Sequence, residues 1–267
     1  MRPTTTPALW PAAGRRRLLA WLKLPYEYCV LYGGLLLFAS VLLVWSAVGS
    51  VLRPLLPRRA GSRVGRYGTM LVFRGLLAAL QATGIFKFDL RALDALRDEG
   101  ALIIAPNHPS LLDAVLVSSR LPHIVSIMKA TIRDNLLLGG AARFAAYIRD
   151  DCPLSMVREA VGALRDGNQL LMFPEGTRTP QRGGHQFKGG FALIARRAQV
   201  PVQTVFIETN SPFLGKGWPL WKMPVFPLIY RVRLGRRFEV HDDIKTVLAD
   251  LECYYRDTLA ARFDAKT

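Results

Sequence analysis

A run of 25 residues without a charged side chain, from Tyr28 to Leu52, constrains the fold of this chain more than any other feature. A helix crosses the hydrocarbon core of a bilayer in about 20 apolar residues, so the run is long enough to span one. We therefore expect residues 1–85 to form an N-terminal membrane-embedded helical segment. Arginines flank the run on both sides, so the flanking charge sets no orientation (Arg15, Arg16, Arg17, Arg53, Arg58, Arg59, Arg63 and Arg66).

Two arrangements of this segment stay open. A second apolar helix is expected over about residues 67–86. The two helices then form a hairpin inserted from one side of the membrane, or the first helix spans the membrane alone. A cleaved signal peptide is disfavoured, because its apolar core has only about 7 to 15 residues and no small-x-small cleavage site precedes a mature start.

The charge balance of the chain fits a lipid surface. A net charge of +16, a pI near 10.4 and 51% hydrophobic residues suit either nucleic acid or an anionic membrane. The flanking arginines favour the membrane, and no nucleic-acid-binding motif is present, so no nucleic-acid partner is expected. Cys29, Cys152 and Cys253 have no metal-like spacing, and we expect packed, unpaired side chains in a reducing compartment.

From about residue 86 the pattern changes to short apolar strands that alternate with helices. This alternation predicts an α/β domain over residues 86–267, with a mixed, largely parallel sheet flanked by helices. Ligands of such sheets collect beyond the carboxyl ends of the strands. Strands are expected at 101–106, 124–128, 145–148, 169–173, 202–207 and 228–233, and helices at 90–98, 111–120, 133–144, 154–166, 188–199 and 243–262.

The segment from Ser211 to Pro227 is rich in proline and aromatic residues. One interpretation is a surface loop with a few buried aromatic side chains. The other is a loop that contacts the membrane interface or an acyl chain, since tryptophan prefers the headgroup region.

His108 and Asp113 form the first chemical motif, directly after the strand expected at 101–106. A histidine whose ring is oriented by a carboxylate is a general base that works near neutral pH. No Gly-x-Ser-x-Gly elbow occurs in the chain, so a covalent serine hydrolase is poorly supported and the base is expected to act on a hydroxyl of the substrate. Taken alone, the pair is more often structural than catalytic.

The second motif, Phe173-Pro174-Glu175-Gly176-Thr177-Arg178, follows the strand expected at 169–173. It offers a glycine-permitted turn, a carboxylate, a hydroxyl and a guanidinium. Arginine grips a phosphate through two N–H groups, whereas Glu175 would hold a substrate hydroxyl or fix Arg178. Taken alone, a structural salt-bridged turn is an equally good interpretation.

Together the two motifs resemble those of the lysophospholipid acyltransferase family, which includes the 1-acylglycerol-3-phosphate acyltransferases. The resemblance rests on their residues, order and spacing, and on three further short matches across residues 100–207. These are Lys129 in Ile127-Met128-Lys129, Lys188-Gly189 and Val200-Pro201-Val202.

The resemblance implies that His108 is the general base, that Asp113 orients it, and that an acceptor hydroxyl attacks the thioester of acyl-CoA or of an acylated carrier protein. It implies no metal and no covalent cofactor. The expected acceptor is 1-acylglycerol 3-phosphate, acylated to phosphatidic acid at the cytoplasmic face of the inner membrane. The residues expected to bind the acceptor phosphate or hydroxyl are Lys129, Arg149, Glu175, Gly176, Thr177 and Arg178.

Two departures from the family pattern leave the acceptor open. The block after Lys129 lacks the family's glutamate and proline, and Thr204 stands where a second proline is usual. Another lyso-lipid acceptor, such as a lyso-amino-acid lipid or a glycolipid precursor, is therefore an alternative. Two further alternatives are a non-catalytic basic membrane adaptor and a hydrolase that uses water in place of the acceptor alcohol.

Overall fold

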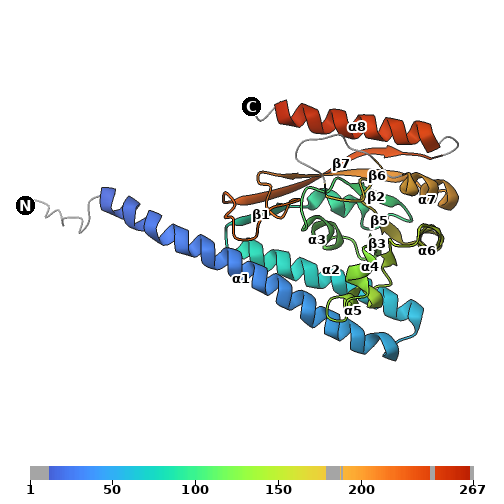
Figure 1. The fold of residues 1–267 in the computed structure, drawn as a ribbon, viewed down its shortest axis with the longest axis horizontal. Coiled ribbons are helices and arrows are strands. Elements are labelled where there is room, and N and C mark those ends of the chain that lie inside the picture. The colour runs from blue at the N-terminus through green and yellow to red at the C-terminus, as the bar shows by residue number, and fades with distance from the viewer. Residues whose placement is uncertain (1–11, 179–186, 188, 241–243, 265–267) are drawn as a thin grey trace, which may run out of the picture.

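The computed structural model describes residues 12–178, 187, 189–240 and 244–264, and the side chains of these ranges from residue 23 to residue 260 (Figure 1). Its centre is a seven-stranded sheet with the strand order β1-β7-β6-β2-β5-β3-β4. All neighbouring strands are parallel except β6 and β7, so the mixed, largely parallel sheet is confirmed. The strands are β1 (Phe86–Asp89), β2 (Ile103–Pro106), β3 (Ile124–Met128), β4 (Ile148–Arg149), β5 (Gln169–Leu171), β6 (Val202–Thr209) and β7 (Leu228–Phe238).

Two strands differ from the sequence expectation. The pattern does not predict β1, a four-residue strand that pairs in parallel with β7 at the edge of the sheet. The strand expected at 145–148 is displaced, because Ala146 adopts a left-handed φ of 56° in a turn and β4 begins only at Ile148.

The helices are α1 (Ala12–Leu55), α2 (Arg58–Ala82), the 3-10 helix η1 (Arg91–Leu96), α3 (Asp113–Ser118), α4 (Ala130–Arg133), α5 (Gly139–Phe144), α6 (Pro153–Arg165), α7 (Gly190–Ala198) and α8 (Ile244–Asp264). The prediction of a single helix over residues 133–144 is wrong. Asn135 Oδ1 accepts hydrogen bonds from the backbone N–H groups of Leu137 (2.9 Å) and Leu138 (3.0 Å), and this turn separates α4 from α5. Residues 188 and 243, at the starts of two expected helices, lie outside the described residues.

Helices cover both faces of the sheet, as Figure 1 shows. Alternate residues of β2 point to opposite faces: Ile104 packs with α1, α2 and α3, whereas Ile103 packs with α6, α7 and α8. Burial on both faces explains why β2 is an apolar run without polar alternation.

The helices α1 and α2 form an antiparallel pair that holds α5 by close backbone contacts. A Cβ on Gly140 would lie 2.0 Å from Ser46 O of α1, and one on Gly65 of α2 would lie 2.7 Å from Phe144 O. The backbone N–H of Gly140 also donates to Ser46 Oγ at 2.8 Å. The N-terminal helices are thus built into the α/β domain rather than hanging from it.

In α1, the stretch Lys23–Leu55 is long and apolar enough to cross a membrane, by length and composition. Most of this stretch is exposed, with only 11% of its most apolar window buried inside the protein. Its outward side chains include Leu36, Val44 and Val51.

The three cysteines are free and exposed, so the prediction that their side chains pack in the interior is wrong. Cys29 lies on the exposed surface of α1, and Cys152 and Cys253 lie at the start of α6 and on α8.

Candidate active site

The expected site residues follow the carboxyl ends of four adjacent parallel strands. His108 follows β2, Glu175 follows β5, Lys129 follows β3, and Arg149 ends β4, in the spatial order β2-β5-β3-β4. Because these strands are parallel, the four ends meet at one edge of the sheet. Neighbouring strands lie about 4.8 Å apart, so β3 is about 10 Å and β4 about 14 Å from β2.

His108 and Asp113 make the hydrogen bond that their spacing predicts. Asp113 is the first residue of α3, and its Oδ2 lies 2.8 Å from His108 Nδ1. The backbone N–H of Ser110 donates to the same oxygen at 2.7 Å. A carboxylate only accepts, so Nδ1 carries the hydrogen and Nε2 keeps its lone pair. The ring is therefore held in the tautomer that a general base needs.

Asp113 is fully buried, and His108 keeps 17% of its side chain exposed. Burial raises the pKa of Asp113 to about 6, against the opposing effect of the His108 hydrogen bond. The negative charge of Glu175 contributes a smaller upward shift of this pKa. Near neutral pH Asp113 remains ionised and accepts from the histidine.

The loop that carries His108 is fixed on both sides. Asn107 extends the pairing of β2 with β6 through its side chain: Nδ2 donates to Ile207 O at 3.1 Å, and Oδ1 accepts from Ile207 N at 2.7 Å. Ser110 Oγ donates to Phe213 O at 3.1 Å. The ring of Phe173 stacks on His108, with 4.0 Å between the ring centroids. Asn107 directly precedes His108 and Phe173 begins the second motif, but no sequence signal assigns them these contacts.

The second motif is a tight turn. Gly176 has a φ of 66°, which glycine adopts without strain, and its N–H donates to Phe173 O at 3.0 Å. Glu175 is buried with 9% exposed, and Thr177 is exposed. The turn therefore points one carboxylate inward and one hydroxyl outward.

Arg178 contacts a part of the chain that the motif does not predict. Its Nη1 donates to Leu214 O at 3.1 Å and to Gly215 O at 3.0 Å. The segment from Ser211 to Pro227 thus lies against the site, and Leu111 N–H also donates to Leu214 O at 3.1 Å. Arg178 ties this segment down in addition to any contact with a substrate.

The two remaining basic residues differ in their partners. Lys129 is exposed at the start of α4, and in the described part of the chain its ammonium makes no ion pair. Arg149 is engaged on two sides, by Asp134 Oδ2 at 2.9 Å and by Asp151 Oδ2 at 2.5 Å. A phosphate at Arg149 would have to replace one of these carboxylates.

An apolar cavity of about 200 Å³ opens beside the first motif. Its walls come from α1, from the loop between His108 and Asp113, and from the segment after Ser211. They include Leu35 and Phe38, Leu111, and Phe213. No polar surface lines it, so it suits a hydrocarbon chain. The buried Phe213 agrees with both interpretations of the 211–227 segment.

Comparisons with known proteins agree with this geometry. The family model described as Acyltransferase matches residues 87–208. The human protein named 1-acyl-sn-glycerol-3-phosphate acyltransferase beta is 26% identical, over 77% of this chain and 75% of its own length. The 1-acyl-sn-glycerol-3-phosphate acyltransferase of Pseudomonas aeruginosa is 22% identical, over 84% of this chain and 88% of its own.

Among solved structures, the 1-acyl-sn-glycerophosphate (LPA) acyltransferase PlsC from Thermotoga maritima has a similar fold. The TM-score is 0.64 at 16% sequence identity, covering 90% of this chain and 96% of that one. The likeness therefore extends over the N-terminal helices as well as the sheet.

Proposed function

We propose that this chain, which belongs to the acyltransferase family, moves a fatty acyl group from acyl-CoA or acyl carrier protein to the free hydroxyl of a lysophospholipid. The acceptor we favour is 1-acylglycerol 3-phosphate, which gives phosphatidic acid, in line with the names of the two relatives. The single observation that carries the proposal is the hydrogen bond between His108 and the buried Asp113.

The reaction follows from that hydrogen bond. Nε2 of His108 removes the proton of the acceptor hydroxyl while the oxygen attacks the thioester carbonyl. The tetrahedral intermediate collapses, the carbon–sulfur bond breaks, and the thiolate leaves with the proton that His108 held. Asp113 stabilises the transient imidazolium. Thioesters are activated donors, so the proposed reaction uses no metal and no covalent cofactor.

The apolar cavity is the proposed place of an acyl chain. Leu111 and Leu112 line it, and both belong to the loop between the base and its carboxylate partner. A chain bound there brings the carbonyl at its end close to His108. Two reactants that are bound side by side need not meet by diffusion. This can lower the free-energy barrier of acyl transfer by at most about 7 to 11 kcal/mol.

The acceptor phosphate is proposed to lie over the ends of β5 and β3. Lys129 follows β3, and Gly176, Thr177 and Arg178 lie in the turn after β5, so positive charge stands at the ends of both strands. The strands β2 and β3 lie about 10 Å apart. An extended lysine side chain and the glycerol phosphate together span that distance. Glu175 is the proposed partner of a substrate hydroxyl.

A second acceptor class is supported by the environment of Arg149. Asp134 and Asp151 already neutralise its guanidinium, and Asp150 Oδ1 accepts from Ala130 N–H at 3.1 Å on the same edge. Asp150, the third carboxylate at this edge, suits a lyso-lipid that carries an amine, such as a lyso-amino-acid lipid, and is a poorer match for a dianionic phosphate monoester.

The enzyme is proposed to be monotopic, in the cytoplasmic leaflet of the inner membrane. Tyr26 OH donates to Thr83 O at 2.6 Å and Trp45 Nε1 to Thr69 Oγ1 at 2.9 Å, so α2 lies beside α1 from Tyr26 to Trp45. If α1 crossed the bilayer upright, α2 and the domain bound to it would enter the hydrocarbon as well. We therefore propose that α1 lies in the membrane surface, with its exposed apolar side toward the hydrocarbon and the active site facing the cytoplasm.

The test is an assay of purified enzyme with a panel of lyso-lipids, with acyl-CoA and with acyl carrier protein, read by mass spectrometry. We expect acylated 1-acylglycerol 3-phosphate from the wild type and none from His108→Ala. If only an amine-bearing lyso-lipid were acylated, the second acceptor class would replace 1-acylglycerol 3-phosphate as the proposed acceptor. Free fatty acid without a lipid product would indicate the hydrolase, and no transfer to any acceptor would indicate the adaptor.

A further inference from the structure

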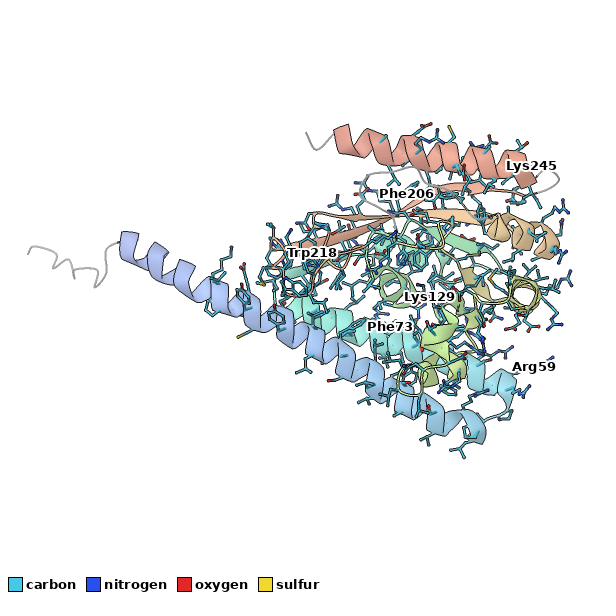
Figure 2. All side chains as sticks on the ribbon, viewed as in Figure 1. Arg59, Phe73, Lys129, Phe206, Trp218 and Lys245 are labelled. Atoms are coloured by element: carbon cyan, nitrogen blue, oxygen red, sulfur yellow. The ribbon has the colours of Figure 1, made fainter. Side chains whose placement is uncertain are left out.

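A second cavity lies between the first turns of α2 and the helix α6, beside the β4 edge of the sheet. Its volume of about 420 Å³ falls within the range of small-molecule sites. Its lining includes Val125 near the start of β3 and Asn168 just before β5, whereas the candidate active site follows the ends of these strands. Figure 2 labels Arg59 at the start of α2 and Lys129 beside α4, one for each site.

One wall of this cavity is basic. Arg59, Arg63 and Arg66 are spaced by four and three residues, so they share one face of α2. Arg66 is only 5% exposed, and it donates from Nη1 to Ala145 O at 3.3 Å and from Nη2 to Asn168 Oδ1 at 3.0 Å. Its Nε is buried and, within the described residues, has no hydrogen-bond partner. The wall is therefore anchored to the sheet, and Arg59 and Arg63 remain exposed at its rim.

The opposite wall is acidic, because Glu159 of α6 and Asp166 at its C-terminal end also line the cavity. As far as the chain is described, neither carboxylate forms an ion pair with the three arginines. The charge of Asp166 still acts on Arg66 through space. Opposite charges that face each other across a cavity without touching favour a ligand with an anion at one end and a cation at the other.

We propose that this cavity binds the phosphoethanolamine headgroup of a membrane phospholipid, with the phosphate toward Arg59 and Arg63 and the ammonium toward Glu159 and Asp166. Arginine suits the phosphate because its fork of N–H groups matches two phosphate oxygens. A lipid source rests on the proposed position of α1 in the membrane surface, since α2 packs against α1. Binding of the headgroup itself does not depend on that position or on the proposed reaction.

The experiment titrates the full-length purified chain with soluble glycerophosphoethanolamine and, separately, with inorganic phosphate, by calorimetry. Arg59→Gln combined with Arg63→Gln should weaken the binding of both ligands about hundredfold, because each of the two lost charge-assisted hydrogen bonds contributes about tenfold in affinity. Glu159→Gln combined with Asp166→Asn should weaken only the amine-bearing ligand. The matched control, Arg53→Gln with Arg58→Gln, removes the same charge at the same end of the helix pair and should leave both affinities unchanged.

Three results would overturn the inference. Inorganic phosphate that binds the wild type as tightly as glycerophosphoethanolamine would remove the role of the acidic wall. Equal losses in the control would reduce the effect to overall charge. If the soluble headgroup binds but vesicles of phosphatidylethanolamine do not displace it, a membrane lipid is excluded as its source. Acyl transfer to a detergent-dispersed acceptor should stay unchanged in the Arg59→Gln and Arg63→Gln double variant, so a failure here is distinguishable from a failure of the proposed reaction.

Discussion

The two ends of the candidate site are built in opposite ways. At the end of β2, Asp113 is fully buried and His108 keeps 17% exposure, and their hydrogen bond is supported by a backbone N–H. At the end of β4, Arg149, Asp134 and Asp151 are 43%, 45% and 44% exposed. Exposed ion pairs are screened by water and contribute little, whereas a buried group that loses its hydrogen-bond partner costs about 1 to 3 kcal/mol.

This difference assigns the chemical step to the end of β2 and the selectivity for the acceptor to the end of β4. The buried pair holds its geometry whether or not a substrate is present, so the base is ready for any hydroxyl that reaches it. The exposed ion pairs exchange partners at little cost, and an acceptor headgroup competes for them directly. Substitutions at the first end should therefore change kcat, and those at the second should change the KM of the acceptor.

The largest effect is expected from His108→Ala. Loss of a general base lowers kcat by about 100-fold to 10,000-fold. The acceptor KM should change little, because the histidine is not one of the proposed phosphate contacts. Steady-state kinetics with both substrates varied measures the split, and a circular-dichroism melt shows whether the fold is intact. Full acyl transfer by this variant would disprove the mechanism.

Asp113→Asn should follow, with a loss of kcat on the order of 100-fold or more, because the histidine loses the carboxylate that fixes its tautomer. In the wild type, kcat/KM should fall as the pH drops below about 6, where Asp113 takes up a proton. A pH profile of kcat/KM in the wild type that stays flat down to pH 5 would contradict this role.

The same carboxyl group predicts a pH dependence of stability. Burial raises the pKa of Asp113 in the folded state to about 6, above the ordinary value of 3.8. The folded state therefore binds this proton more tightly, and the contribution of Asp113 to the free energy of unfolding is lost as the pH rises from about 4 through about 6. Relative to the wild type, Asp113→Asn should gain stability over that window, as measured by urea unfolding at several pH values. A constant difference would contradict the raised pKa.

Arg178→Ala should raise the acceptor KM about tenfold, because a charge at the proposed phosphate site is lost. It should also lower the melting temperature, because the hydrogen bonds to Leu214 O and Gly215 O are lost. Arg178→Lys is the informative control, because it keeps the charge but not the two-carbonyl contact. An unchanged KM in both variants would remove Arg178 from the phosphate site and leave it as a structural tie.

The smallest effect is expected from Arg149→Gln. Because Asp134 and Asp151 already occupy the guanidinium, the KM for 1-acylglycerol 3-phosphate should change less than about twofold. Asp134→Asn combined with Asp151→Asn should lower that KM by releasing Arg149. A large increase in KM for Arg149→Gln would instead assign Arg149 to the phosphate and remove the contrast between the two ends.

The sequence predicts the first end better than the second for a physical reason. His108 and Asp113 lie five residues apart in one loop, so the strand end and the following helix bring them together locally. The order β2-β5-β3-β4 and the contact of Arg178 with Leu214 depend on long-range packing that no local pattern records. The same limit explains β1, which is a strand only because β7 lies beside it.

Local signals also explain one error in the helices. Asp134-Asn135 and Gly139-Gly140 are turn-forming pairs inside the helix expected at 133–144, and Asn135 does break it. The apolar Leu136-Leu137-Leu138 run between them suggests a continuous helix, yet these side chains are exposed.

The tight glycine contacts among α1, α2 and α5 have a practical consequence for anyone who works with the protein. Deleting residues 1–85 to obtain a soluble enzyme would remove Leu76, Leu77 and Leu80 from the core and leave Gly140 without its partner at Ser46. Such a truncation should aggregate, and exchanging the N-terminal helices with those of a relative should fail unless the small residues at the crossing are exchanged with them.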